Sequence, residues 1–331
     1  GVIMNKKILI TDYVWPSVEP ESKILIDAGF EPVVAPDSSE ETLTSLAKDV
    51  EGIMFCFAEV TSKVLENASN CKVAARFGIG VDNVDISKAT ELGIIVTNVP
   101  DYCMDEVTDH ALGMILALNR RFLPHTKSVT DGNWKNVTLD KVMHRTRGSV
   151  LGIVGFGRIG RSLASKANGF GFNIIAYDPL LKTGDKVNGI EIVDFEHLLK
   201  SSDYISLHVP LIPQTKGMIG KKELSLMKKG SIIVNCARGG LIDENALADS
   251  ISSGHISGAG LDVVEPTPPK SDNPLFTLEN VIITPHTAFF SQASTLELET
   301  RTAHETVKVI NGSKPENWIN PEVSGKSRTG I

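Results

Sequence analysis

An arginine and a histidine in the second half of the sequence each follow an apolar run of strand length. Arg238 comes after residues 232–235, and His286 comes after residues 281–284 and Pro285. The planar guanidinium of an arginine matches a carboxylate and a neighbouring carbonyl, which a lysine would not reproduce. An imidazole exchanges a proton near neutral pH. The pair predicts a site that binds an oxo acid, with His286 as the acid in reduction and the base in oxidation.

A glycine-rich segment at residues 155–160 predicts the second reactant. It reads Gly-Phe-Gly-Arg-Ile-Gly, follows an apolar run and precedes a helical pattern. In a dinucleotide-binding turn, Gly155 permits the tight turn, Gly157 lets the backbone approach a pyrophosphate, and Gly160 allows close packing of helix on strand. Arg158, inside this loop, is interpreted as a pyrophosphate or solvent contact at most.

Asp178 ends the next apolar run, 18 positions after Gly160. A carboxylate at that place accepts hydrogen bonds from the adenosine ribose hydroxyls and repels a 2′-phosphate. The segment therefore predicts NAD, rather than NADP, as the cofactor. The alternative, in which the glycines only form a turn and Asp178 only ends a strand, is disfavoured by the complete context.

The elements that must position these residues follow from the pattern of the whole chain. Short apolar runs alternate with helical segments, which is typical of parallel sheets covered by helices on both faces. The runs are at 8–10, 33–35, 53–55, 73–75 and 94–96, and then at 150–154, 173–177, 204–208, 232–235, 258–261 and 281–284. Longer helices are predicted at 106–119 and 294–310. We predict an α/β protein with two doubly wound parallel-sheet domains, Rossmann- or flavodoxin-like.

Composition and charge exclude other classes of protein. The chain has 331 residues, 41% of them hydrophobic, and its 33 basic and 40 acidic side chains give a net charge of −7. It is too hydrophobic for a disordered chain, no apolar run reaches the ~20 residues that cross a bilayer, and its acidity disfavours nucleic acid. The four cysteines lack metal-ligand or disulfide spacing, so we expect free thiols, no metal and a cytoplasmic location without a membrane partner.

Taken in order, these motifs resemble the D-2-hydroxyacid dehydrogenase family, and the resemblance covers nearly the whole chain. The segments that carry it are 152–160, Asp178-Pro179, Leu207-His208-Val209-Pro210-Leu211, Asn235-Cys236-Ala237-Arg238-Gly239-Gly240, Leu261-Asp262-Val263 and Thr284-Pro285-His286. Residues 76–83 and 286–291 look closer to the branch that includes the C-terminal binding protein corepressors and their bacterial relatives.

The resemblance implies two domains with an active-site cleft between them. Residues 1–103 and 287–331 would form a discontinuous substrate-binding domain, and residues 104–286 would form the NAD-binding Rossmann domain. The function implied is the NAD(H)-dependent interconversion of a small 2-oxo acid and a D-2-hydroxy acid. The resemblance also implies a homodimer formed through the NAD-binding domain.

The resemblance further implies which residues contact the cofactor and the substrate. Cofactor contacts are expected at Gly155, Gly157, Arg158, Ile159, Gly160, Asp178, Pro179, His208, Val209, Pro210, Thr215, Cys236, Ala237, Arg238, Asp262 and His286. Backbone N–H groups in the glycine turn at Ile79 and Gly80 are expected to bind the substrate carboxylate. Arg76 is either a second cation for the substrate or part of a salt bridge at a strand edge. Phe289 is either a wall of the substrate pocket or a core residue.

The sequence departs from the family pattern beside the predicted histidine. Most members place a glutamate five residues after the aspartate of their Asp-Val pair, where it orients the histidine and favours its protonated form. Here Thr267 has that position, and Glu265, followed by Pro266, is the only carboxylate nearby. Either Thr267 orients His286 through its hydroxyl or the proline-rich loop redirects Glu265 to that task; the register favours Thr267. We therefore expect weakened or unusual catalysis.

A second function is compatible with that departure. A chain that keeps the cofactor loop and lacks the supporting carboxylate could be an NADH-sensing dimeric binding or scaffold protein, as the likeness to corepressors suggests. A formate- or phosphite-type dehydrogenase is a more remote third alternative, because no residue marks a one-carbon or inorganic substrate. His110, on the long predicted helix, is interpreted as structural or hinge-facing.

Overall fold

The computed structural model describes residues 6–134 and 143–331 and divides the chain into two compact units. The first comprises Gly1–Tyr102 and Ser291–Ile331, and the second comprises Cys103–Phe290. Each unit contains one sheet, so the predicted α/β class with two parallel-sheet domains is confirmed. The assignment of substrate binding to residues 1–103 and 287–331, and of NAD binding to residues 104–286, stays a prediction.

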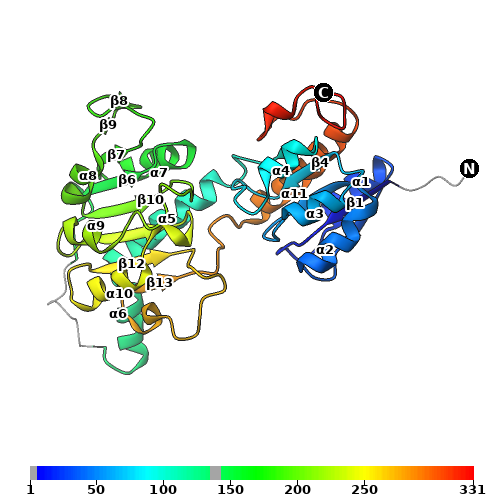
Figure 1. Ribbon diagram of the computed structural model, residues 1–331. Coiled ribbons are helices and arrows are strands. Elements are labelled where there is room, and N and C mark those ends of the chain that lie inside the picture. The colour runs from blue at the N-terminus through cyan, green and yellow to red at the C-terminus, as the bar shows by residue number, and fades with distance from the viewer. Residues whose placement is uncertain (1–5, 135–142) are drawn as a thin grey trace, which may run out of the picture. The chain divides into compact units, whose positions relative to one another are not determined.

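The first unit is built on a parallel sheet with the strand order β2-β1-β3-β4-β5. The strands are β1 (Lys6–Ile10), β2 (Phe30–Val34), β3 (Val50–Phe55), β4 (Val73–Arg76) and β5 (Ile95–Thr97). The helices are α1 (Glu19–Asp27), α2 (Glu40–Leu46), α3 (Ser62–Asn67), α4 (Ile86–Glu91) and α11 (Gln292–Ile310), with 3-10 turns at Ala47–Asp49 and Pro321–Val323. Helix α11, orange in Figure 1, packs on α1, β3 and β4 and so joins the two chain segments of this unit.

Local sequence explains these elements. Residues 8–10 are fully buried, because the middle strands of a sheet covered on both faces must be apolar throughout. Ser39 and Thr61 precede α2 and α3, and their hydroxyls accept hydrogen bonds from the backbone N–H groups of Thr42 and Val64. These side chains satisfy donors that the first turn of a helix leaves unpaired.

The second unit is built on a larger sheet with the strand order β13-β12-β11-β10-β6-β7-β9-β8, parallel except for the β8–β9 hairpin. The strands are β6 (Val150–Val154), β7 (Asn173–Tyr177), β8 (Lys186–Val187), β9 (Ile190–Ile192), β10 (Tyr204–Leu207), β11 (Ile232–Asn235), β12 (Gly258–Leu261) and β13 (Val281–Ile283). The helices are α5 (Met104–Asn119), α6 (Phe122–Thr130), α7 (Arg158–Asn168), α8 (Phe195–Ser201), α9 (Lys221–Leu226) and α10 (Glu244–Ser252), with 3-10 turns at Gly239–Leu241 and Pro274–Thr277.

Two hydrophobic clusters cover the two faces of this sheet. One includes Ile115 of α5 and Leu163 of α7, and the other includes Leu198 of α8 and Leu247 of α10. Burial of both faces explains why β6, β10 and β11 are almost entirely apolar. The arrangement is the doubly wound fold, in which the loops at the carboxyl ends of the strands share one edge of the sheet.

Two elements of the second unit were not predicted from the sequence. The β8–β9 hairpin is made of strands too short to show a periodic pattern. Helix α6 buries none of its residues, and its few apolar side chains, all exposed, are too few to give a clear periodic signal.

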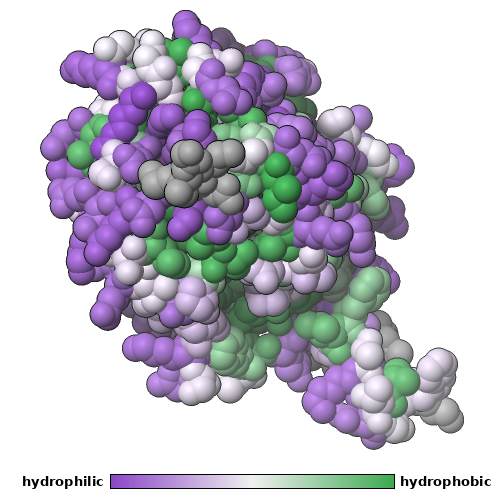
Figure 2. All heavy atoms as spheres, turned by 90° about the vertical axis from the view of Figure 1, so that its right-hand side faces the viewer, coloured by the Kyte–Doolittle hydropathy of each residue, from purple (hydrophilic) through white to green (hydrophobic). Residues whose placement is uncertain are grey.

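The surface matches the expected composition. On the face shown in Figure 2, hydrophilic side chains predominate, with smaller hydrophobic areas between them. Within residues 6–134 and 143–331, no helix combines the length and apolar character that a membrane crossing requires. The cytoplasmic location stays a prediction.

Candidate active site

The glycine loop lies between β6 and α7, where the structure explains the identity of two of its glycines. Gly155 has a φ of +92°, and a Cβ there would lie 2.6 Å from the carbonyl oxygen of His208. A Cβ at Gly160 would overlap the carbonyl oxygen of Gly155. Gly157 is the N-cap of α7 and makes no side-chain cap, and a Cβ there would meet no protein atom within 4 Å. The uncapped start of α7 therefore suits an anionic pyrophosphate.

Asp178, at the end of β7, connects its loop to the glycine loop. Its Oδ2 accepts a hydrogen bond from the N–H of Phe156 at 2.8 Å, and its Oδ1 accepts one from the N–H of Leu180 at 2.9 Å. Each carboxylate oxygen offers two lone pairs, so one acceptor position on each oxygen is left by these two bonds. The two backbone N–H groups thus fix the position of the Asp178 carboxylate. A fixed acceptor is what the predicted hydrogen bonds from the ribose hydroxyls require.

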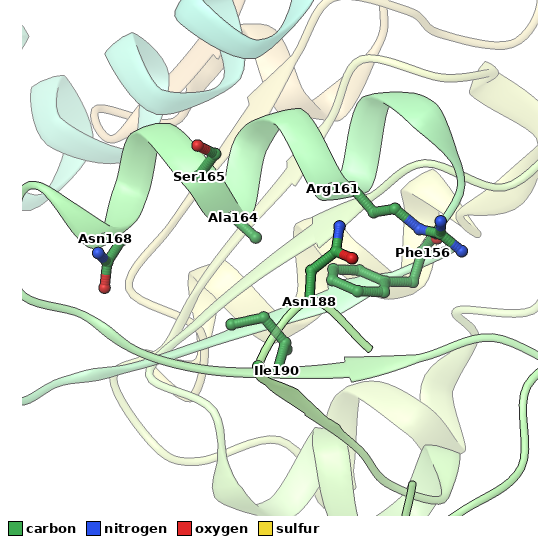
Figure 3. Close-up of a pocket in the computed structure, with 8 residues that line it drawn as sticks. Phe156, Arg161, Ala164, Ser165, Asn168, Asn188 and Ile190 are labelled. Carbon is green, nitrogen blue, oxygen red and sulfur yellow. The ribbon is translucent and has the colours of Figure 1, made fainter. Parts of the chain in front are cut away.

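A pocket of about 450 Å³ lies between Phe156, helix α7 and the turn that joins β8 to β9. Figure 3 shows Arg161 of α7 beside the ring of Phe156, with Asn188 and Ile190 of the hairpin region opposite. The Arg161 guanidinium lies 5.8 Å from the Phe156 ring centroid, and its Nε donates to the carbonyl oxygen of Phe156. The residues that line this pocket include none of the predicted cofactor-binding residues, so it is distinct from the predicted NAD site.

The loop after β10 carries His208 and the predicted adenine-side residues. The His208 Nε2 and the Ser206 hydroxyl lie 2.8 Å apart, and burial lowers the pKa of His208 to about 4. Its imidazole is therefore neutral at physiological pH. Thr215 donates its hydroxyl proton to the carbonyl oxygen of Pro210 and accepts from the N–H of Ile212, which closes the loop. Cofactor contacts from His208, Val209, Pro210 and Thr215 stay predictions.

Arg238 follows β11 in a turn that Asn235 holds closed. The Asn235 side chain accepts a hydrogen bond from the N–H of Ala237 at 3.0 Å and donates one to the carbonyl oxygen of Arg238 at 2.8 Å. One guanidinium nitrogen of Arg238 donates to the carbonyl oxygen of Ala237. The next residue must be glycine, because a Cβ at Gly239 would overlap the backbone of Val264. Thus the loops after β11 and β12 are in contact beside Arg238.

His286 follows β13 in a turn organised by Asp262, which follows β12 and is almost completely buried. The N–H of His286 donates to the backbone carbonyl of Asp262 at 2.8 Å. The Asp262 carboxylate accepts from the N–H groups of Thr287 and Ala288 and from the hydroxyl of Thr284, the last at 2.6 Å. Bonds of this kind to a charged acceptor are stronger than neutral ones. The predicted catalytic imidazole is thus carried by a backbone that a buried carboxylate fixes.

The two candidate partners of His286 belong to the loop after β12. The Thr267 hydroxyl donates its proton to the carbonyl oxygen of Val264 at 2.7 Å, so toward an imidazole it can act only as an acceptor. The N–H of Glu265 donates to the Glu244 carboxylate. Which of Thr267 and Glu265 supports His286 stays a prediction. The Phe289 ring lies 6.4 Å from the His286 ring between centroids, nearly perpendicular to it.

The predicted substrate residues of the first unit form a loop after β4. Arg76 is buried, its Nε donates to the carbonyl oxygen of Gly80 at 3.0 Å, and another of its nitrogens donates to the carbonyl oxygen of Phe77. Asn98 donates to the carbonyl oxygen of Ile79 at 2.7 Å. Both of these hydrogen bonds go to backbone carbonyls of its own loop, and the role of Arg76 toward a substrate stays a prediction. Because the carbonyls are bound, the loop has a fixed shape.

Sequence reasoning missed several residues that organise the site. Asn235 and Thr284 stand inside the quoted motifs, but only the structure shows that their side chains hold the turns of Arg238 and His286. Asn98 had no sequence signal. His110 of α5 lies beside Thr284, 174 positions away in the chain, a proximity that spacing does not reveal.

The geometry is consistent with what comparison with known proteins finds. Residues 112–288 match the family model described as D-isomer specific 2-hydroxyacid dehydrogenase, NAD binding domain. The chain belongs to this family. The NAD-binding prediction is confirmed for the family domain, and the dehydrogenase interpretation is favoured over the scaffold alternative.

Relatives in this dehydrogenase family cover nearly the whole chain. The chain is 43% identical to a D-3-phosphoglycerate dehydrogenase from Methanocaldococcus jannaschii over 95% of its own length and 59% of that protein. It is 39% identical to a glyoxylate reductase from Thermococcus litoralis, over 97% of the chain and 98% of that protein. Among solved structures, a D-lactate dehydrogenase from Aquifex aeolicus, complexed with NAD and lactic acid, aligns with a TM-score of 0.83 and 27% identity, over 95% and 99% of the two chains.

Proposed function

We propose that this protein is an NAD(H)-dependent oxidoreductase that interconverts a small 2-oxo acid and a D-2-hydroxy acid. One observation carries the proposal: the glycine loop, Arg238 and His286 follow β6, β11 and β13 at one edge of a single parallel sheet. Ligands of open α/β sheets bind at that edge. A dinucleotide loop, a cation and an acid–base group at one edge are the parts that carbonyl reduction needs.

The residues present fit a nicotinamide dinucleotide. The structure leaves the start of α7 uncapped, has no room for a Cβ at Gly155 or Gly160, and holds the Asp178 carboxylate in place. When bound, NADH supplies the hydride that reduces a carbonyl carbon.

The chemical steps that this chain performs concern the substrate's oxygen atoms. Arg238 binds the carboxylate and the neighbouring carbonyl oxygen with its guanidinium donors, and it stabilises the negative charge that develops on that oxygen. His286 donates a proton to the oxygen as the hydroxyl forms, and in the reverse direction it removes that proton. Backbone N–H groups at Ile79 and Gly80 bind the substrate carboxylate further, and Phe289 forms part of the pocket wall.

A homodimer formed through the NAD-binding domain is part of the proposal. Helix α6 belongs to this domain and buries none of its own residues, while Phe122, Leu123, Val129 and the following Trp134 are 46–79% exposed. Exposed apolar side chains that cluster on one short segment mark interaction surfaces. A second copy of this chain is the occupant that we propose for this surface.

Steady-state kinetics with NADH and a panel of 2-oxo acids tests the proposed function. The panel contains glyoxylate, hydroxypyruvate, pyruvate and bulkier 2-oxo acids. We expect turnover with at least one of them, and a loss on the order of 100- to 1,000-fold in Arg238→Ala because a charge-stabilising donor is removed. Arg145→Ala, at an exposed arginine, is the matched control and should keep full activity. Tight NADH binding without any turnover would favour the scaffold alternative and contradict the proposal.

A further inference from the structure

A hydrogen-bonded network of three side chains extends from α5 to the turn of His286, and the proposed mechanism does not use it. The Nε2 of His110 lies 2.9 Å from the hydroxyl oxygen of Thr284. That hydroxyl donates to the Oδ1 of Asp262 at 2.6 Å, and His110 Nε2 itself is 3.7 Å from the same oxygen. The three residues come from α5 and from the ends of β13 and β12, so tertiary structure alone brings them together.

The number of donors and acceptors on each side chain determines the direction of each hydrogen bond in this network. An ionised carboxylate only accepts, and a hydroxyl has a single proton. Since the Thr284 hydroxyl gives its proton to Asp262, its oxygen must accept from His110. The Nε2 of His110 therefore carries a proton. The hydrogen-bonded network leads from that N–H through the Thr284 hydroxyl to the Asp262 carboxylate.

The position of the His286 backbone depends on the Asp262 carboxylate, at the end of this network. His286 has a φ of +54°, in the left-handed region that residues other than glycine rarely adopt. Such a conformation persists only where the surrounding structure holds it. Asp262 provides that support, because its carboxylate accepts the N–H groups of Thr287 and Ala288 and its carbonyl accepts that of His286.

Two other acidic side chains of α5 are paired away from His110. Asp105 and Asp109 bind Lys166 of α7 at 2.9 and 2.6 Å. The His110 side chain is 24% exposed, whereas that of Asp262 is 1% exposed. A donor near the surface thus reaches a buried acceptor through one hydroxyl.

We propose that His110 is a positioning residue for the reaction: its Nε2–H fixes the Thr284 hydroxyl on Asp262 and thereby fixes the turn that carries His286. The proposal rests on the proposed function for the role of His286. A displacement of about 1 Å in a catalytic group costs on the order of 100-fold in rate.

Two matched pairs of variants test this role. His110→Leu and Thr284→Val remove the donor and the hydroxyl, whereas His110→Gln and Thr284→Ser keep them. The measurements are kcat and KM for the best 2-oxo acid, the dissociation constant of NADH, and the thermal unfolding midpoint. We expect the first two variants to lose on the order of 10- to 100-fold in kcat with NADH affinity within about twofold of the unmodified protein, and the second two to keep most of the rate.

The outcomes separate this proposal from the proposed function. An unmodified protein that turns over no 2-oxo acid contradicts the proposed function. In that case NMR of isotope-labelled histidine still decides the positioning role, since the His286 ring signal should shift or broaden in Thr284→Val and stay unchanged in Thr284→Ser. Unchanged kcat in His110→Leu, an equal loss in His110→Gln and His110→Leu, or an unmoved His286 signal in Thr284→Val would overturn the positioning role.

Discussion

At the scale of single residues, the sequence departs from the family pattern at the position expected to support His286. Thr267 occupies the position of the usual glutamate, and its hydroxyl proton goes to the carbonyl oxygen of Val264. A hydroxyl that accepts from an imidazole can orient it but cannot stabilise its positive charge as a carboxylate does. The buried Asp262 instead holds the backbone around His286. The structure thus fixes the backbone that carries His286, while reduced electrostatic support for its protonated ring stays a prediction.

Thr267→Glu should restore that support if Thr267 faces His286. A carboxylate beside an imidazole favours its protonated form, which is the form that donates a proton during reduction. The fall of kcat for reduction with rising pH should then move to higher pH by about 1 unit. Thr267→Gln, which is similar in size and neutral, is the control and should show no such movement. Identical pH profiles for the two variants would show that Thr267 does not face His286.

At the scale of elements, the turn between β6 and α7 was predicted correctly, because Gly155 and Gly160 each have a local packing reason. The Gly160 position packs directly on Gly155, whereas Gly157 faces open space. Gly160→Ala should therefore destabilise the second unit by about 1–3 kcal/mol through overpacking. Gly157→Ala should fold normally but bind NADH more weakly, since a methyl group would stand where the pyrophosphate approaches. Thermal unfolding and fluorescence titration with NADH measure the two effects.

Other elements show what the sequence could not predict. The long helices α5 and α11 and the buried strands have strong periodic patterns, and the structure contains them within a few residues of the predicted bounds. Helix α6 has no buried face, and the β8–β9 hairpin has strands of two and three residues, so neither carries a periodic signal. The contact of His110 with Thr284 joins residues from opposite ends of the unit, and only the packing of α5 against the sheet creates it.

At the scale of the whole molecule, a pair of buried carboxyl groups connects the two chain segments of the first unit. Glu21 of α1 and Glu299 of α11 are 0% and 5% exposed, and Trp15 donates its indole N–H to Glu21. Burial and the neighbouring carboxyl group raise the pKa of Glu299 to about 7, and burial also raises the pKa of Glu21. The folded unit therefore holds protons that the unfolded chain releases at lower pH.

That difference makes stability depend on pH in a stated direction. A carboxyl group with a raised folded pKa contributes most below its unfolded value of 4.5, and the contribution is lost as the pH rises towards about 7. The urea concentration at the midpoint of unfolding should therefore decrease as the pH is raised from 4.5 to about 7. Glu299→Gln should show a smaller fall and be more stable than the unmodified protein at pH values above about 7. An equally steep decrease of the urea midpoint in Glu299→Gln would exclude the two carboxyl groups as the source of the pH dependence.

The exposed apolar side chains of α6 yield a prediction about assembly. Leu123→Asp combined with Val129→Asp should convert the proposed homodimer into a monomer, because charges would have to be buried at the interface. Leu296→Asp replaces a comparably exposed leucine of α11 in the first unit and should leave the dimer intact. Sedimentation velocity distinguishes the two states. A monomer already present in the unmodified protein at micromolar concentration would contradict the assignment.

The central claim is that Arg238 and His286 serve one reaction, the reduction of a 2-oxo acid by NADH. The most direct measurement follows the oxidation of NADH by the 2-oxo acid panel with the unmodified protein and with His286→Asn, and determines the chirality of the product. We predict turnover that yields the D-2-hydroxy acid, and a loss on the order of 100- to 10,000-fold in the variant with NADH binding retained. Absence of turnover despite NADH binding, or equal rates for the two proteins, would contradict the claim.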